Sequence, residues 1–215
     1  MQRTLVPPIT FENAQLEAYG RTISCDAVGG DLVDLVTSYG KDARVIKAEL
    51  ITMEEQYRLR WDRGAISEGL ALVEQALSRG PIGPYQLQAA TAALHAHAAT
   101  PEETDWPQIA ILYGKLLELN PSPVIALNYA VAVAMGGKLQ DGLKQIDDLG
   151  RAGALDGYYL FHAAPADLLR LNRYSEAAEA YERAASLATN GVEVDFLNRR
   201  LSQMEATDRA RNSLT

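Results

Sequence analysis

Two kinds of residue are scarce in the sequence, and each scarcity excludes a class of function. Cys25 is the only cysteine in 215 residues, so no disulfide can form within the chain and a structural zinc site with two or four cysteines is excluded. Basic residues are outnumbered, because 20 Lys and Arg stand against 28 Asp and Glu, for a net charge of −8. A chain this acidic, without a basic block, is a poor candidate for direct binding of DNA or RNA.

Long apolar runs are also missing. No stretch approaches the roughly 20 residues that cross a bilayer, so we expect no membrane association. The first residues, MQRTLVPPITFEN, contain two prolines and no apolar core of a secretory signal. We therefore expect a cytoplasmic location.

Signatures of catalysis and cofactor binding are absent as well. No serine stands in a Gly-x-Ser-x-Gly frame, and the two Gly-Gly pairs outside the helices lack the spacing of a phosphate-binding loop. His95 and His97 are two residues apart on an expected helix, so they point to different faces and cannot bind one metal together. We expect no catalytic residue, no metal and no cofactor.

The sequence is rich in helical periodicity. Hydrophobic residues make up 47% of the chain and charged residues 22%, which is the balance of a globular domain. From about residue 61, apolar side chains recur every three or four residues, and Pro or Gly interrupts the pattern between helices. Eight helices are expected, over residues 62–79, 84–98, 106–119, 124–135, 139–149, 155–171, 175–188 and 192–204. The polar tail, residues 206–215, is expected to fray.

The first 56 residues have a different pattern, since proline and glycine divide them into short pieces. The apolar run Leu32–Tyr39 fits either a helix or a strand, and we favour a helix there and over Phe11–Tyr19; Val45–Met53 is expected to be a strand or an extended arm. The segment is too short and too interrupted to bury a core of its own. We therefore expect residues 1–56 to be an irregular segment packed on a helical domain of residues 57–205.

The helices form an internal repeat. The copy over residues 158–190 is similar to a tetratricopeptide repeat, with small Ala164 at the helix crossing, and with Tyr174 and Tyr181 in the second helix. Thirty-five residues earlier the same frame fits more loosely, with Ala130 at the crossing and Ile146 in the second helix. The sequence predicts an all-α fold: a right-handed stack of antiparallel helix pairs, with about three repeats plus a capping helix. The alternative is a generic all-helical bundle.

Longer phrases carry a closer resemblance. They are RLRWDRGAISEGLALVEQAL, GPYQLQAATAALHAHA, TDWPQIAILYGKLLELNPSPVIALNYAVAVA, HAAPADLLRLNRYSEAAEAYERA and VEVDFLNRRLSQM. In this order they resemble the tetratricopeptide-like C-terminal extension of a group of bacterial extracytoplasmic-function (sigma-24-like) RNA polymerase sigma factors. The resemblance covers roughly residues 42–205. Domains that bind core polymerase and promoter DNA have no counterpart here, and residues 1–41 match the family poorly.

The resemblance implies a protein–protein interaction module in transcription regulation, without DNA binding of its own, and RNA polymerase or sigma domains as partners. Stacked helix pairs expose one helix of each pair on a concave surface. The residues expected there are mostly apolar: Leu94, Val124, Leu127, Val131, Tyr159, His162 and Leu169. Such a groove needs cover, by the N-terminal segment as our first choice, by a second copy of the chain, or by a partner helix.

A second set of candidates is polar. These side chains lie on otherwise apolar helices: Gln86, Gln88, His95, Tyr113, Asn128 and Tyr158. They either satisfy one another at repeat junctions or form a small-ligand pocket with His162. The functional alternative to an interaction module is a weak or promiscuous hydrolase, or a small-ligand binder, that uses a cleft near His162.

Overall fold

The computed structural model describes residues 34–36, 49–170 and 173–213, and these residues are all-α apart from one short ribbon. The predicted fold class is confirmed at this level. Eight α-helices are present in the described residues: α1 (Arg63–Ser78), α2 (Pro84–His97), α3 (Trp106–Leu119), α4 (Pro123–Met135), α5 (Leu139–Ala152), α6 (Tyr159–Leu169), α7 (Tyr174–Leu187) and α8 (Gly191–Asn212). None of them is long and apolar enough to span a membrane.

Capping residues explain where these helices begin. The side chain of Asp62 accepts a hydrogen bond from Ala65 N–H at the start of α1, and Asp105 does the same for Gln108 N–H at the start of α3. Such caps satisfy backbone donors that have no partner within the helix. Proline is the first residue of α2 and of α4, where its missing N–H costs nothing.

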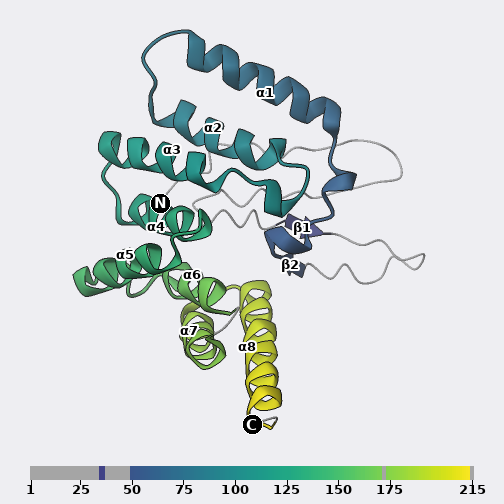
Figure 1. The fold of residues 1–215 in the computed structure, drawn as a ribbon, viewed down its shortest axis with the longest axis vertical. Helices are drawn as coiled ribbons and strands as arrows, with labels where there is room; N and C mark the ends of the chain where they lie inside the picture. The colour runs from purple at the N-terminus through teal and green to yellow at the C-terminus, as the bar shows by residue number, and fades with distance from the viewer. Residues whose placement is uncertain (1–33, 37–48, 171–172, 214–215) are drawn as a thin grey trace.

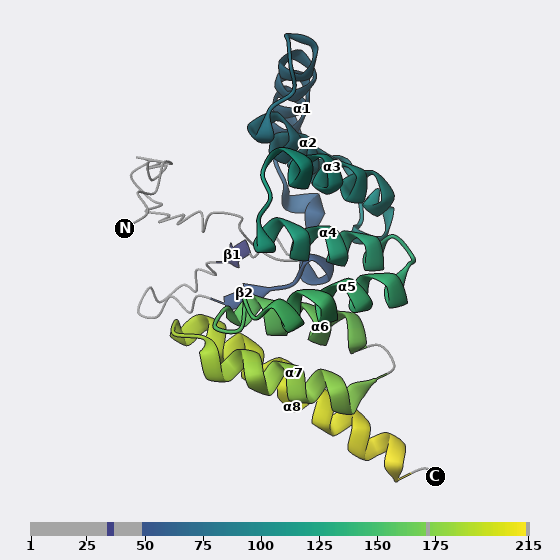
Figure 2. The same cartoon turned by 90° about the vertical axis from the view of Figure 1, so that its left-hand side faces the viewer.

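Helices that follow one another in the chain pack side by side, and α4 also contacts α6. Figures 1 and 2 show the helices stacked in chain order, with α1 at one end of the molecule and α7 and α8 at the other. The largest cluster of buried side chains joins α4 to α8 and includes Leu127, Ala130, Phe161, Tyr181 and Leu197. The last five helices therefore share one core.

Two expectations about local structure are wrong. Helix was favoured over strand for Leu32–Tyr39, but its described part, Asp34–Val36, is strand β1, paired antiparallel with β2 (Glu49–Ile51), because the pairing supplies partners for the backbone groups of both. The tail expected to fray from residue 206 is helical as far as Asn212. Buried Met204 anchors α8, and extending an existing helix through Glu, Ala and Arg costs little. The expected helix over Phe11–Tyr19 lies outside the described residues.

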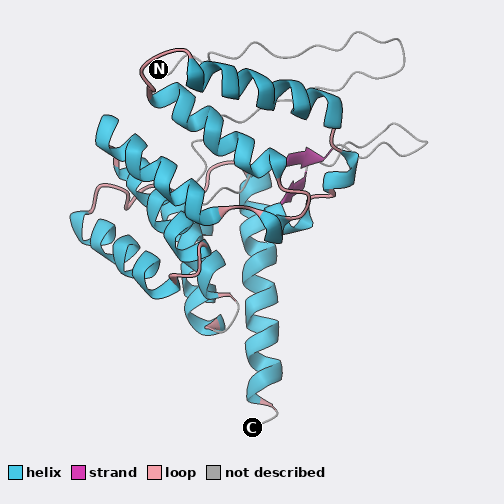
Figure 3. Cartoon of the chain, turned by 45° about the horizontal axis from the view of Figure 1, so that its top comes forward, coloured by secondary structure: helices cyan, strands magenta, loops and turns pink. Residues whose placement is uncertain are grey.

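A segment that we call the strap, residues 49–61, connects the ribbon to α1. It runs from β2 through two 3-10 turns, Met53–Glu55 and Arg58–Arg60, and lies between the upper helices and α8 (Figures 1 and 3). Of the segment expected to pack on the helices, residues 1–56, the part from residue 49 is described and contacts α8 through β2.

Candidate functional site

The strap is held on the helices by side chains along its whole length. The buried ones are Leu50, Thr52, Met53, Gln56 and Arg58, whereas Tyr57 and Leu59 are 62% and 77% exposed. One side of the strap is therefore buried against the helices, and the other side faces solvent. The surface on which it lies, which we call the strap face, is the candidate binding site.

Arg58 fixes one end of the strap to α2. Its Nη1 donates to the backbone carbonyls of His95 (3.3 Å), Ala98 (3.0 Å) and Thr100 (3.1 Å), at and just beyond the end of that helix. Carbonyls at a helix C-terminus lack partners within the helix and carry partial negative charge, so a cation is stabilising there. The guanidinium also lies 5.0 Å from the centroid of the Trp61 ring. Burial lowers the pKa of Arg58.

Met53 holds the middle of the strap in an apolar socket. It is 5% exposed and forms one cluster with Trp106 and Ile109 of α3 and Ala132 of α4. Leu94 of α2 packs at the edge of this cluster. Three helices therefore contribute to one socket, which fits a single unbranched side chain.

Arginines fix the other end of the strap to α6 and α8. Glu54 forms an ion pair with Arg170, at the C-terminus of α6, and a carboxylate oxygen of Glu55 lies 3.9 Å from Nη1 of Arg200 in α8. Arg199 Nη2 donates to the backbone carbonyl of Leu50 at 2.8 Å. Burial alone would lower the pKa of Arg170, but Glu54 raises it above its ordinary value. The carboxylates of Glu54 and Glu55 thus both face cations.

The expected concave-face residues do not form an open groove. Val124, Leu127, Val131, Tyr159 and Leu169 all belong to the core cluster that joins α4 to α8, because α4 and α6 pack directly against each other. Leu94 lies under the strap instead, in the Met53 cluster. His162 belongs to a separate hollow described below.

The expected polar set does not converge on one pocket. Gln86 accepts a hydrogen bond from Gly83 N–H at the start of α2, and Gln88 is exposed. Two residues apart on a helix, their side chains point to different faces. Tyr113 packs against the Met53 cluster, Asn128 is buried in α4, and Tyr158 packs on the core beside Tyr159. His95 lies edge-on to Trp106 with ring centroids 5.2 Å apart.

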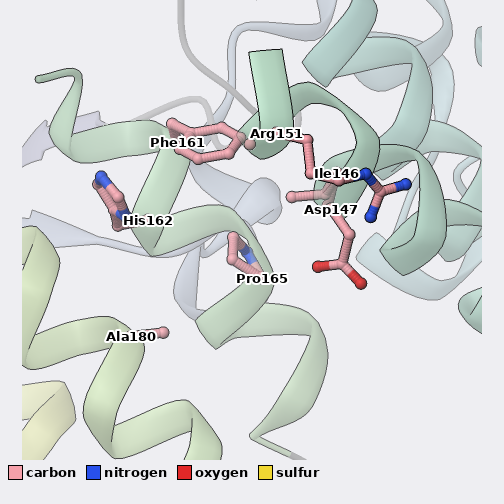
Figure 4. Close-up of a pocket in the computed structure, with 8 residues that line it drawn as sticks. Ile146, Asp147, Arg151, Phe161, His162, Pro165 and Ala180 are labelled. Carbon is pink, nitrogen blue, oxygen red and sulfur yellow. The ribbon is translucent and has the colours of Figure 1, made fainter. Parts of the chain in front are cut away.

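His162 lines a shallow hollow of about 460 Å³ between α5, α6 and α7 (Figure 4). Its Nε2 lies 2.9 Å from the backbone carbonyl of Asp156. The lining residues are Ile146, Asp147, Gly150, Arg151, Phe161, His162, Pro165 and Ala180. They include no serine, threonine or cysteine whose hydroxyl or thiol the imidazole could activate. No cluster of three or more metal-ligating side chains occurs in the described part of the chain.

The buried imidazole of His95 makes stability depend on pH. Burial, and secondarily the charge of Arg58, lower its pKa from 6.5 to about 4 in the folded chain. Between these two values the unfolded chain binds a proton that the folded chain does not, so the free energy of unfolding falls as the pH falls from 6.5 toward 4. We expect His95 to account for a loss of roughly 2 kcal/mol over this window.

Urea titrations of the wild-type chain and of His95→Gln at each pH measure this loss as a difference between the two. His97 provides the matched control, since it is exposed and lies two residues further along α2. His97→Gln is expected to keep the wild-type pH dependence. A pH dependence that His95→Gln leaves unchanged would contradict the assignment.

The comparisons with known proteins give one relative and no fold match. No protein-family model matches the sequence, and neither does any solved structure. The chain is similar to an uncharacterised protein of Rhizobium meliloti (strain 1021), with 42% identity over 158 residues. The match covers 73% of the chain but 37% of the relative, so the chain spans little more than a third of the length of the relative that it matches.

Proposed function

We propose that the chain is a protein–protein interaction module, built as a right-handed, tetratricopeptide-like stack of antiparallel helix pairs. The pairs are α2–α3, α4–α5 and α6–α7, and α8 caps the stack. Positions 35 residues apart in the last two pairs support the repeat. Gly142 and Ala177 are both buried small residues near the start of the second helix, and one turn later Ile146 and Tyr181 are both buried.

The observation that carries the proposal is the bound strap. The stack already holds an irregular segment of polypeptide by backbone hydrogen bonds, by ion pairs and by an apolar socket. Main-chain contacts combined with side-chain pockets are how domains bind extended peptides with affinity and specificity. A catalytic role has less support, because no serine, threonine or cysteine lines the hollow beside His162.

The resemblance to sigma-factor extensions supplies the context, and we infer a role in transcription regulation from it. RNA polymerase or sigma domains are the partners that this resemblance suggests. Nearly two thirds of the Rhizobium relative lies outside the match, which is room for the domains that would contact polymerase. The net charge of −8 supports contact with protein rather than with DNA.

Biolayer interferometry with purified components tests the proposed function. The immobilised chain is exposed to bacterial core RNA polymerase and, separately, to the part of the Rhizobium relative that lies outside the match. We expect a Kd of about 10 µM or tighter for at least one of them, and no binding of duplex DNA at physiological salt. Absence of binding to both proteins, or sequence-dependent DNA binding, would refute the proposal.

A further inference from the structure

We propose that the α6–α8 end of the strap face is a binding site for a short acidic segment of a partner protein, and that residues 50–55 occupy it within the chain. The inference rests on the proposed interaction function and adds the chemistry of the partner. The segment it fits has two apolar side chains three residues apart, like Leu50 and Met53, followed directly by two carboxylates, like Glu54 and Glu55.

Charge complementarity is the first argument. Arg170, Arg199 and Arg200 stand together at this end of the face, in a chain whose net charge is −8. Each of them contacts the strap, two through carboxylates and one through a backbone carbonyl. The site therefore recognises acidic side chains and a backbone carbonyl together, while the rest of the acidic surface repels non-specific anions.

Unused hydrogen-bond donors are the second argument. Arg200 is 7% exposed, and its Nη1 donates to the side chain of Gln203 at 3.3 Å. Its Nε and Nη2 have no hydrogen-bond partner in the described residues, and its ion pair with Glu55 is long, at 3.9 Å. A buried guanidinium whose N–H groups lack acceptors destabilises the folded chain. A carboxylate that accepted two hydrogen bonds from it, in a bidentate contact, would remove that cost. The strap is therefore an imperfect occupant.

Accessibility is the third argument. The side chains of Glu54 and Glu55 are 51% and 45% exposed although they contact Arg170 and Arg200. Water reaches the two carboxylates from the outer side of the strap, whereas the side chains of Arg170 and Arg200 lie beneath them and are 19% and 9% exposed. An incoming carboxylate therefore takes the place of Glu54 or Glu55 from the solvent side, and this exchange does not require the helical stack to unfold.

The test uses the full chain and a fluorescent peptide with the sequence of residues 49–61. In fluorescence anisotropy, the Glu54→Gln/Glu55→Gln chain, whose own strap is weakened, is expected to bind the peptide at least about tenfold more tightly than the wild-type chain. Adding Arg170→Gln and Arg200→Gln should abolish binding. Adding Arg209→Gln, an exposed arginine further along α8, should leave it unchanged. A peptide with glutamine in place of Glu54 and Glu55 should bind weakly.

Circular dichroism verifies that each variant is folded. Should the double variant unfold, the wild-type chain serves instead: excess peptide is expected to accelerate amide exchange in residues 50–60 and to leave α7 unaffected.

The inference is overturned by a folded double variant that does not bind, by binding that the arginine substitutions do not weaken, or by unchanged exchange in the wild-type chain. Dimers that the peptide dissociates would overturn it in favour of strap exchange between two copies. Polymerase binding is a separate readout, so either proposal can fail alone.

Discussion

Replacing Gly142 with alanine is expected to lower the free energy of unfolding by about 3 kcal/mol or more. Gly142 lies in the first turn of α5, where that helix meets α4. A Cβ at this position would stand 2.5 Å from the carbonyl oxygen of Ala130, 2.5 Å from Cβ of Ala134 and 2.9 Å from its backbone nitrogen. All three atoms are backbone or Cβ, so no side-chain rotation relieves the clash and the two helices must move apart.

Gly69→Ala is the matched control for this substitution. Gly69 lies inside α1, and a Cβ added there would meet nothing within 4 Å. Alanine is favoured over glycine in a helix interior by about 1 kcal/mol, so this variant should be slightly more stable than the wild-type chain. Urea denaturation of both variants measures the difference. If Gly142→Ala proves as harmless as Gly69→Ala, the helices do not cross this closely.

The helices were predictable because their signals are local. Asp62 and Asp105 stand directly before the first residues of α1 and α3, which is the position of a capping side chain, and the structure shows both caps. Proline as the first residue of α2 and of α4 is also a local signal for the start of a helix. Only a few neighbouring residues decide such features, so sequence alone identifies them.

The strap face was not predictable because none of its contacts is local. Glu54 and Arg170 are 116 residues apart in the chain, and Leu50 and Arg199 are 149 apart. From the sequence alone, a charged side chain is expected to face solvent, since arginine and glutamate are rarely buried without partners. The one available signal was the position of Arg200, which follows Phe196 by four residues and so lies on a face that the apolar pattern of α8 assigns to the core.

The six polar candidates do not gather in one pocket, and the reason is different. Polar side chains on apolar helices were assigned to one site, although such residues also satisfy backbone groups near their own position. Gln86 does this at the start of α2, while His95 packs against an aromatic ring. Sequence gives the polarity of a position, but the direction of the side chain depends on how each helix is rotated against its neighbours.

Replacing Arg58 with alanine is expected to destabilise the chain by about 2 to 3 kcal/mol. Arg58 is 3% exposed, and its Nη1 is shared by three backbone carbonyls. Alanine would leave these carbonyls, those of His95, Ala98 and Thr100, without this donor and would open a void beside Trp61. The strap would lose its attachment to α2 while its contacts with α6 and α8 remained.

Arg60→Ala separates this effect from a general loss of positive charge. Arg60 is exposed and lies 5.5 Å from the ring centroid of Tyr57, itself exposed, so its removal should change stability by no more than about 0.5 kcal/mol. Urea denaturation compares the two variants, and amide exchange shows where protection is lost. Arg58→Ala should expose residues 56–61 and the end of α2 before the rest of the chain. Equal stabilities for the two variants would mean that Arg58 does not anchor the strap, and the strap would then depend on the contacts that its residues 50–56 make with the helices.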